Sequence, residues 1–400
     1  MELDKILING DMLEELDKLE ENSIGSIVTD PPYEINFMNN GWDNAGVAFS
    51  VETWKKCLRV LKPGGYLLSF AAARTQHRIA CAIEDAGFEI RDIIMWLQSN
   101  GFPKSADVSK TLQNSDNIDK KELSYKFTGF GYNLKPAYEP VIVARKPTKS
   151  SIIDNIVEFG VGVLNIDECR IPYEDTANAA SNPLYRKMNG YKINHGTDIN
   201  STSYVLKHED GEMNINPLGR FPSNVITSIG NLEDDYIKVN LGESCRFFYC
   251  AKASKRDRDE GLDDLPTKQT VGGGGGIGDY ANDVNSCSGK FGSEKAPHKN
   301  FHPTVKPTSL MQYLVRLVTP KGETILDPFM GSGSTGKAVA YENNDRNADY
   351  SFIGIELNPE YCDIAQRRIE FAEKDKTHLT EYKQKKSKPD ETAKKQSKLF

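Results

Sequence analysis

The chain has 400 residues, a formal net charge of −7 and an ordinary share of apolar residues. This length allows a full hydrophobic core in a main domain, together with a smaller domain. No apolar stretch is long enough to cross a membrane and no signal peptide opens the chain, so neither membrane insertion nor secretion is expected.

The cysteines argue in the same direction. There are seven, an odd number scattered along the chain, which disfavours a disulfide framework and fits a reducing cytoplasm. Cys245 and Cys250 lack a second Cys or His pair at metal-ligand spacing. No metal site is therefore expected.

The first 145 residues alternate predicted strands and helices. Strands are predicted at 6–10, 26–29, 66–70, 88–97 and 139–144, and helices at 11–19, 51–61 and 74–86. Strands separated by helical segments are typical of an α/β fold, in which helices cover both faces of a largely parallel sheet.

This alternation breaks in the middle of the chain. Residues 174–215 are rich in Asn, Ser and Asp, and residues 265–300 contain a glycine run at 272–276. Long irregular segments in a compact protein are usually functional or disordered. Basic residues gather between Arg246 and Arg258, which indicates either a phosphate-binding face or an ordinary solvated surface.

The periodic pattern returns at residue 301. Helices are predicted at 308–318, 334–341 and 359–372, and strands at 323–326 and 352–356. The last 28 residues are Lys-rich with few apolar side chains, so they are expected to form a flexible tail.

A glycine-rich loop follows the strand predicted at 323–326. Residues 327–336 read Asp-Pro-Phe-Met-Gly-Ser-Gly-Ser-Thr-Gly, and Glu356 ends the next strand, twenty residues after Gly336. A G-x-G-x-x-G loop between a strand and a helix, followed by such a carboxylate, is typical of sites for nucleoside-containing cofactors. A phosphate-binding P-loop is disfavoured, because Ala338 stands where a Ser or Thr should bind magnesium.

A second motif, Asp30-Pro31-Pro32-Tyr33, follows the strand predicted at 26–29. Ligands of open α/β sheets bind beyond the carboxyl ends of strands, so the motif is placed for chemistry. A carboxylate and a proline-fixed carbonyl can accept hydrogen bonds from an aromatic amino group, and a tyrosine ring offers a face for stacking. The alternative is a proline turn capped by Asp30.

Together and in this order, the two motifs resemble the permuted amino-methyltransferases of DNA, over roughly the first 145 residues and residues 301–372. The resemblance implies a circularly permuted Rossmann-like methyltransferase fold with a mostly parallel, seven-stranded sheet. It implies S-adenosylmethionine as the methyl donor and double-stranded DNA as the partner, with the target base flipped out of the duplex. Family members carry Asp in the catalytic motif mostly for adenine N6 and Ser mostly for cytosine N4, so Asp30 favours adenine.

The resemblance also implies the site residues. The catalytic set is Asp30, Pro31, Pro32 and Tyr33. The cofactor set is Asp11, His302, Thr304, Lys306, Pro307, Asp327, Pro328, Phe329, Gly331, Gly333, Thr335 and Glu356. The implied roles place the methionine part on Asp327 and the loop at Gly331 and Gly333, the ribose on Glu356, the adenine amino group on Asp11, and the cofactor carboxylate on Thr304 and Lys306.

The expected organisation is a catalytic half at 1–149, an inserted irregular target-recognition region at 150–300, a cofactor-binding half at 301–372 and the tail at 373–400. Three alternatives remain: a cytosine-N4 methyltransferase of the same fold, a nicotinamide-dependent oxidoreductase using the glycine loop, and a non-catalytic DNA-binding relic. A dehydrogenase would need further strands after the loop, and the intact motifs argue against a relic.

The end of the chain carries a further pattern. Gln396, Leu399 and Phe400 resemble the short peptides that dock on bacterial sliding clamps. An ordinary disordered terminus is the alternative. The chain is expected to act as a monomer or homodimer, away from membranes.

Overall fold

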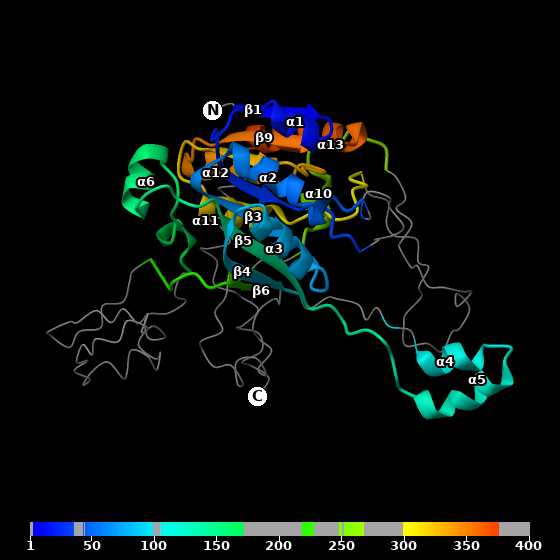
Figure 1. Ribbon diagram of the computed structural model, residues 1–400. Coiled ribbons are helices and arrows are strands. Elements are labelled where there is room, and N and C mark those ends of the chain that lie inside the picture. The colour runs from blue at the N-terminus through cyan, green and yellow to red at the C-terminus, as the bar shows by residue number, and fades with distance from the viewer. Residues whose placement is uncertain are drawn as a thin grey trace, which may run out of the picture.

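The computed structural model of the chain describes residues 3–35, 43, 45–98, 105, 107–171, 218–227, 248–249, 252–267 and 299–375. These residues form one sheet with helices on both faces (Figure 1). The strands are β1 (Lys5–Asn9), β2 (Ile24–Thr29), β3 (Leu61–Phe70), β4 (Glu89–Leu97), β5 (Tyr138–Arg145), β6 (Val225–Thr227), β7 (Phe248–Tyr249), β8 (Thr324–Asp327) and β9 (Ser351–Glu356).

The helices are spread along the whole described part of the chain. They are α1 (Met12–Asp17), α2 (Val51–Val60), α3 (Gln76–Asp85), α4 (Val108–Gln113), α5 (Ile118–Leu123), α6 (Ile152–Phe159), α10 (Lys255–Asp259), α11 (Thr308–Val318), α12 (Ser334–Arg346) and α13 (Pro359–Lys374), with short 3₁₀ turns η3 (Val47–Phe49), η4 (Tyr125–Phe127) and η5 (Asp167–Cys169). None of the helices in the described part of the chain is long and apolar enough to span a membrane.

The strand order shows how the two ends of the chain combine. It is β1-β9-β8-β2-β3-β5-β4-β6-β7, and within the described sheet β5 runs antiparallel to its neighbours β3 and β4 while the other pairs are parallel. The late strands β8 and β9 lie between the first two strands of the chain. This interleaving is the permuted arrangement that the motif order predicted.

The sheet contains more than the seven strands expected. Seven strands from β1 to β4 make up its body, and the short β6 and β7 extend it to nine. Both added strands come from residues 150–300, the predicted target-recognition region, and lie between its two irregular segments. A strand of two or three residues is too short to show the alternation on which a sequence prediction depends.

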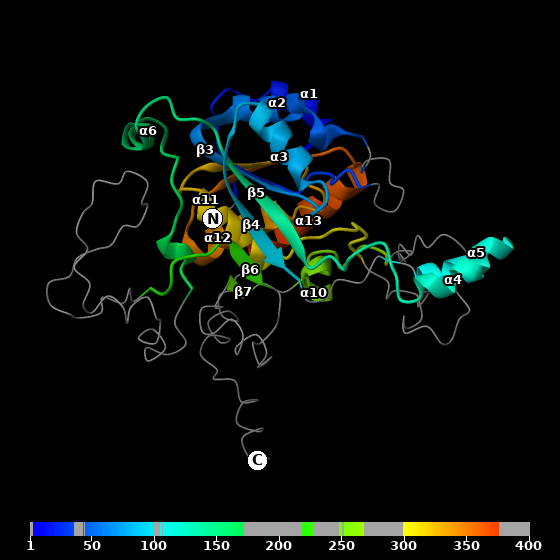
Figure 2. The ribbon, with the colours of Figure 1, turned by 60° about the horizontal axis from the view of Figure 1, so that its bottom comes forward.

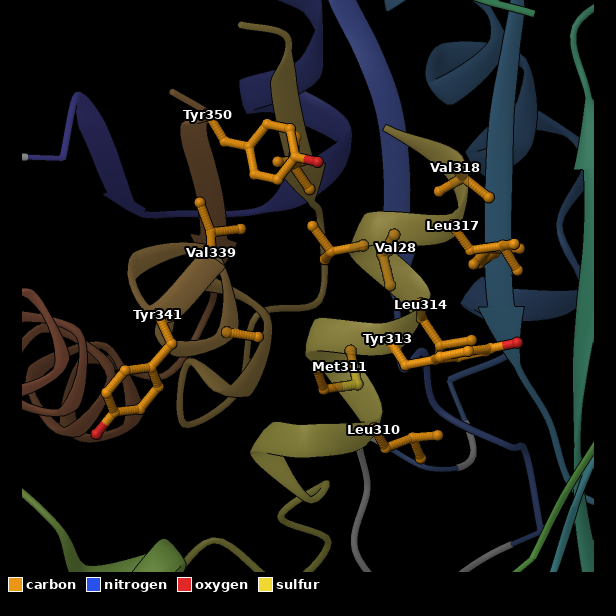
Figure 3. Packing of buried hydrophobic residues seen from close by; sticks show 14 of the residues in the cluster. Val28, Leu310, Met311, Tyr313, Leu314, Leu317, Val318, Val339, Tyr341 and Tyr350 are labelled. Carbon is orange, nitrogen blue, oxygen red and sulfur yellow. The ribbon is translucent and has the colours of Figure 1, made fainter. Parts of the chain in front are cut away.

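The core lies on both faces of the sheet, because neighbouring residues of a strand point in opposite directions. Val28 packs with α11 and α12 on one face, as the close view of that cluster shows (Figure 3). Ile27 packs with α1, α2 and α3 on the other face. Strands buried on both faces are mostly apolar, which explains why these elements were recognisable in the sequence.

Most predicted elements are present with small shifts at their ends. Helix α11 has the predicted bounds. Strand β3 begins five residues earlier than predicted, since Lys62-Pro63-Gly64-Gly65 continues the strand past a register shift against β2. Helix α12 runs on to Arg346 and ends at Asn347, which adopts a left-handed conformation.

Three parts of the chain form helices that were not predicted: α4 with α5, α6, and the short α10. Helices α4 and α5 stand away from the body of the molecule in both views (Figures 1 and 2). Helix α6 instead packs onto the sheet: buried Asn155 donates hydrogen bonds of 2.9 Å to the carbonyls of Pro63 and Val161. The first residues after position 150 therefore support the start of β3.

Candidate active site

The site begins where β2 and β8 end side by side. Leu326 pairs with Ile27 in parallel register, so Asp327 and Asp30 follow adjacent strands at the same edge of the sheet. The Thr29 hydroxyl donates a hydrogen bond of 2.7 Å to Asp327 Oδ1. The fold thus joins the catalytic and glycine-loop motifs directly, although they lie at opposite ends of the sequence.

Asp327 holds the start of the glycine loop. Its carboxylate accepts hydrogen bonds from Thr335 Oγ1 at 2.5 Å, Thr29 Oγ1 at 2.7 Å and the backbone N–H of Phe329 at 3.2 Å. Burial raises the pKa of Asp327 to about 6, against the effect of these donors. Both carboxylate oxygens are engaged by the chain itself, so Asp327 shapes the loop; its predicted contact with the methionine part stays a prediction.

The two predicted loop glycines face different neighbours. Both have positive φ, 54° at Gly331 and 75° at Gly333, which favours glycine. A Cβ on Gly331 would lie 2.9 Å from His302 Nε2, whereas a Cβ on Gly333 would lie 2.8 Å from the Cβ of Ala365 in α13. Gly331 therefore borders the predicted cofactor residues, while Gly333 permits close packing of a helix.

Glu356 lies beside this loop at the end of β9. Its Oε2 accepts from the backbone N–H of Gly331 and its Oε1 from that of Asn358, each at 2.8 Å. Burial raises the pKa of Glu356, and the backbone donors oppose the rise. Asp11 follows the adjacent strand β1, is exposed, and caps α1 through the N–H of Leu13. The structure thus brings both carboxylates to the same edge as the glycine loop.

The segment before α11, residues 302–307, lies on the other side of the glycine loop from Glu356. His302 packs edge-on against Tyr361 at 4.6 Å, and its Nδ1 accepts from the backbone N–H of Thr304 at 3.4 Å. Burial, with the nearby cations Lys306, Arg368 and Arg258, lowers the pKa of His302 to about 3, so its ring is neutral. Pro307 then caps α11.

Lys306 lies at the catalytic motif. Its Nζ is 2.5 Å from Asp30 Oδ2, 3.1 Å from the Tyr33 hydroxyl and 3.6 Å from Glu139 Oε2, and its side chain is 7% exposed. The ammonium also lies over the ring of Phe70, 4.8 Å from its centroid. Burial lowers the pKa of Lys306, but Asp30 and Glu139 raise it more, so the net shift is upward and the ammonium stays charged.

Asp30 itself is partly open. Oδ1 is buried and has no hydrogen-bond partner among the described residues, while Oδ2 is held by Lys306. Burial raises the pKa of Asp30, and the Lys306 ammonium opposes the rise. Pro31 is buried, and the Tyr33 carbonyl accepts from the Thr75 hydroxyl at 2.9 Å. A buried acceptor without a donor is costly, so Asp30 Oδ1 is placed to accept a further hydrogen bond.

Sequence reasoning missed Glu139 and Gln98. Glu139, in β5, accepts from the Tyr33 hydroxyl at 3.2 Å and from Gln98 Nε2 at 2.6 Å. It was seen as the first residue of an apolar strand. A charged residue in a strand otherwise buried on both faces was the available signal, but sequence alone does not show which strand lies beside β3.

Part of the basic stretch contacts the cofactor half. Asp257 in α10 accepts from buried Lys337 at 2.8 Å and from the Thr308 backbone N–H at 3.0 Å. Arg258 donates to the carbonyl of His302 at 2.8 Å. Lys337 thus forms an ion pair within the protein. This agrees with the rejection of a phosphate-binding P-loop, in which the lysine would bind phosphate.

Several predictions fall outside the described residues. They concern Arg246, Cys245, Cys250, the glycines at 272–276, and Gln396, Leu399 and Phe400 of the tail. Within the part of the chain that the structure describes, no group of His, Cys, Asp and Glu could hold a metal ion.

Comparison with known proteins identifies the family that this geometry indicates. The profile of the DNA methylase family, which groups adenine-N6 and cytosine-N4 enzymes, matches residues 24–367. The chain belongs to this family, whose methyl donor is S-adenosylmethionine. The Gly331 loop, with the Glu356 carboxylate beside it, fits such a cofactor, since ribose hydroxyls need an acceptor next to a closely approaching backbone.

Individual relatives extend the comparison. The Type II methyltransferase M.HindIII of Haemophilus influenzae is 26% identical over 405 residues, covering 91% of this chain and 94% of the relative. The DNA adenine methyltransferase YhdJ of Escherichia coli is 41% identical over 71 residues, covering 18% of this chain and 22% of the relative. The solved M1.HpyAVI–SAM complex covers 91% of this chain and 98% of the solved chain, with 18% identity and a TM-score of 0.39.

Proposed function

We propose that this DNA methyltransferase acts on the N6 amino group of adenine. The observation that carries the proposal is the buried Oδ1 of Asp30, which lacks a donor among the described residues and lies in the motif that ends with the Tyr33 ring. An exocyclic amino group with two N–H bonds supplies such a donor. In a duplex this group is inaccessible, so the base must flip out, at a cost of a few kcal/mol.

The chain's residues then act on the nitrogen. The aromatic lone pair is delocalised into the ring, which makes the amine a poor nucleophile. A hydrogen bond from the amino group to Asp30 Oδ1 favours a pyramidal nitrogen. The lone pair is then less delocalised into the ring and more available to attack the methyl group. The bound cofactor supplies a methyl group on a sulfonium. The nearby Asp30 carboxylate would stabilise the positive charge that methyl transfer places on the nitrogen, until the nitrogen loses a proton to solvent.

Two observations favour adenine over cytosine. The first residue of the catalytic motif is Asp, which members of this family carry mostly for adenine. The local match to a relative described as a DNA adenine methyltransferase points the same way. A cytosine-N4 enzyme of the same fold is the second candidate, because the family contains both.

Analysis of the product distinguishes these candidates. The full chain is incubated with S-adenosylmethionine and unmethylated genomic DNA, which is then digested to nucleosides for mass spectrometry. We expect N6-methyladenine; N4-methylcytosine instead would refute the adenine assignment while leaving DNA methylation intact. Methylation-aware sequencing of the same DNA identifies the recognition sequence.

We further propose that residues 150–300 carry the contacts that select this sequence. The support is their break from the α/β pattern and the exposed Lys255 and Arg256 of α10. Base-edge contacts specify a sequence, whereas such cations would bind phosphates and position the enzyme. The clamp-binding tail at Gln396, Leu399 and Phe400 stays a prediction.

A further inference from the structure

Four polar side chains, the Asp30 carboxylate among them, meet beside the end of β2. Lys306 Nζ lies 2.5 Å from Asp30 Oδ2 and 3.6 Å from Glu139 Oε2, and the Tyr33 hydroxyl is within hydrogen-bond distance of both Lys306 and Glu139. Gln98 anchors the other Glu139 oxygen at 2.6 Å. The cluster, defined by Asp30, Tyr33, Glu139 and Lys306, draws on β5, the loop after β2 and the segment before α11.

The two oxygens of Asp30 have different surroundings. Oδ2 is bound to the ammonium, and Oδ1 has no partner among the described residues. A charge-assisted hydrogen bond of this length fixes the orientation of the carboxylate. It therefore holds Oδ1 ready for an incoming donor without competing for it.

We propose that Lys306 and Glu139 are an opposed pair of positioning residues: Lys306 keeps Asp30 ionised and oriented, and Glu139 limits how strongly Lys306 neutralises it. This inference rests on the proposed role of Asp30 as acceptor for the target amino group. It assigns Lys306 to the catalytic carboxylate, in place of the cofactor carboxylate suggested by the family resemblance.

The physical reason is the burial of Asp30. Desolvation favours the protonated acid, which would offer a poorer acceptor to the amine, and a nearby cation opposes this. A cation bound too tightly would instead withdraw electron density from the acceptor. Glu139 competes for the same ammonium and also retains the Tyr33 hydroxyl. The three charged groups, two carboxylates and one ammonium, leave a net charge of about −1 near the nitrogen that becomes positive.

Removing the charge of Lys306 and removing that of Glu139 should have opposite effects on the ionisation of Asp30. Lys306 lowers the pKa of Asp30 and Glu139 raises it. Tyr33 has its pKa raised well above the usual range, so it stays neutral. Asp327, on β8, lies near enough for Asp30 to raise its pKa, and His302 is neutral at this site. Removing the Lys306 charge should thus shift the ionisation of Asp30 to higher pH, and removing the Glu139 charge should shift it to lower pH.

The test is the pH profile of methyl transfer by the full chain. Single-turnover rates on unmethylated genomic DNA, with saturating labelled S-adenosylmethionine, are measured from about pH 5 to 9 for Lys306→Met and Glu139→Gln. We expect the acid limb to move up by about one pH unit or more in Lys306→Met, so that the rate falls about tenfold on the acid limb and recovers at high pH. In Glu139→Gln the limb moves down.

Controls separate this proposal from its rivals. Glu34→Gln makes the same isosteric change near the motif, where the carboxylate binds the N–H groups of Gly46 and Ala48, and should leave the limb in place. Asp30→Asn should be slower than wild type by about 10²-fold or more at every pH, and a rate close to that of wild type would refute the proposed function itself. Weaker cofactor binding in Lys306→Met with an unmoved limb would assign Lys306 to the cofactor and overturn the inference.

Folding is monitored by thermal unfolding at each pH. If Lys306→Met does not fold, Glu139→Gln decides alone. An acid limb shifted to lower pH supports the proposed pair of positioning residues, and an acid limb that is unmoved or shifted to higher pH overturns it.

Discussion

Asp30 and Asp327 follow adjacent parallel strands, yet the protein treats them differently. Asp327 accepts from Thr29, Thr335 and the Phe329 backbone, so its charge and lone pairs are used within the fold. Asp30 has one oxygen on Lys306 and the other without a donor among the described residues. The difference indicates that a carboxylate saturated by its own chain holds a loop, whereas one left incomplete is available for chemistry.

The largest effect is expected at the incomplete carboxylate. Asp30→Asn should lower the methylation rate by about 10²–10⁴-fold, since an amide is a weaker acceptor and cannot balance the charge on the amine. S-adenosylmethionine affinity, measured by calorimetry, should stay within about threefold of wild type, less than 1 kcal/mol. A loss of cofactor binding as large as the loss of rate would move Asp30 from the target base to the cofactor.

Asp327 should affect stability more than affinity for the target, with a defined pH dependence. Its pKa is about 6 in the folded chain and 3.8 when unfolded. The folded state therefore binds the proton more tightly, and the contribution of Asp327 to stability declines as pH rises from about 4 to 6, by roughly 3 kcal/mol. In urea denaturation, the stability of wild type relative to Asp327→Asn should fall over this range; a constant or rising difference would contradict it.

Gly331 and Gly333 test whether the glycine loop also has one side that stabilises the fold and another that binds a ligand. Gly333→Val should lower the free energy of unfolding by roughly 1–3 kcal/mol, because the side chain meets Ala365 of α13 at a positive φ. Blocked cofactor entry, the effect expected from sequence, would be secondary. Gly331→Ala instead meets His302 and should mainly weaken cofactor binding. Denaturation and calorimetry on both variants would reveal the split, and equal profiles would argue against it.

Features that depend on a local sequence pattern were predicted, whereas features that depend on contacts between distant segments were not. Strands such as β2 and β9 were found because short, mostly apolar runs are typical of strands in an α/β sheet, and α11 because its apolar residues repeat at helical spacing. The motifs were found because Asp30-Pro31-Pro32-Tyr33 and the glycine loop are local patterns. Strands β6 and β7 were missed because two or three residues are too few to show alternation, although their residue types favour strands.

The same limit applies to the site. Asp30, Lys306 and Glu139 are brought together by β2, β5 and the segment before α11, whose spatial order is a property of the sheet. No spacing in the sequence places Glu139 beside Tyr33. Likewise, the split between Gly331 and Gly333 depends on where α13 packs, which no local pattern contains.

The smallest effect is expected from the exposed basic side chains of α10. In α10, Asp257 is committed to Lys337 and Thr308, whereas Lys255 and Arg256 are exposed, and Arg256 pairs with Glu260 at the surface. Changing Lys255 and Arg256 to Gln should weaken DNA binding modestly and reduce the slope of log affinity against log salt by about 1–2, as for one or two lost phosphate contacts.

A matched control neutralises two other exposed cations, Lys18 just after α1 and Arg91 in β4, each of which is paired with a glutamate. Fluorescence anisotropy with a labelled duplex at several salt concentrations measures both slopes. If the α10 variant keeps the wild-type slope, or the control loses as much, the DNA lies elsewhere. A reduced slope in the α10 variant alone would place phosphates next to the segment that, through Asp257 and Arg258, holds the start of α11 and His302. The same short helix would then contact DNA on its outer side and support the cofactor loop on its inner side.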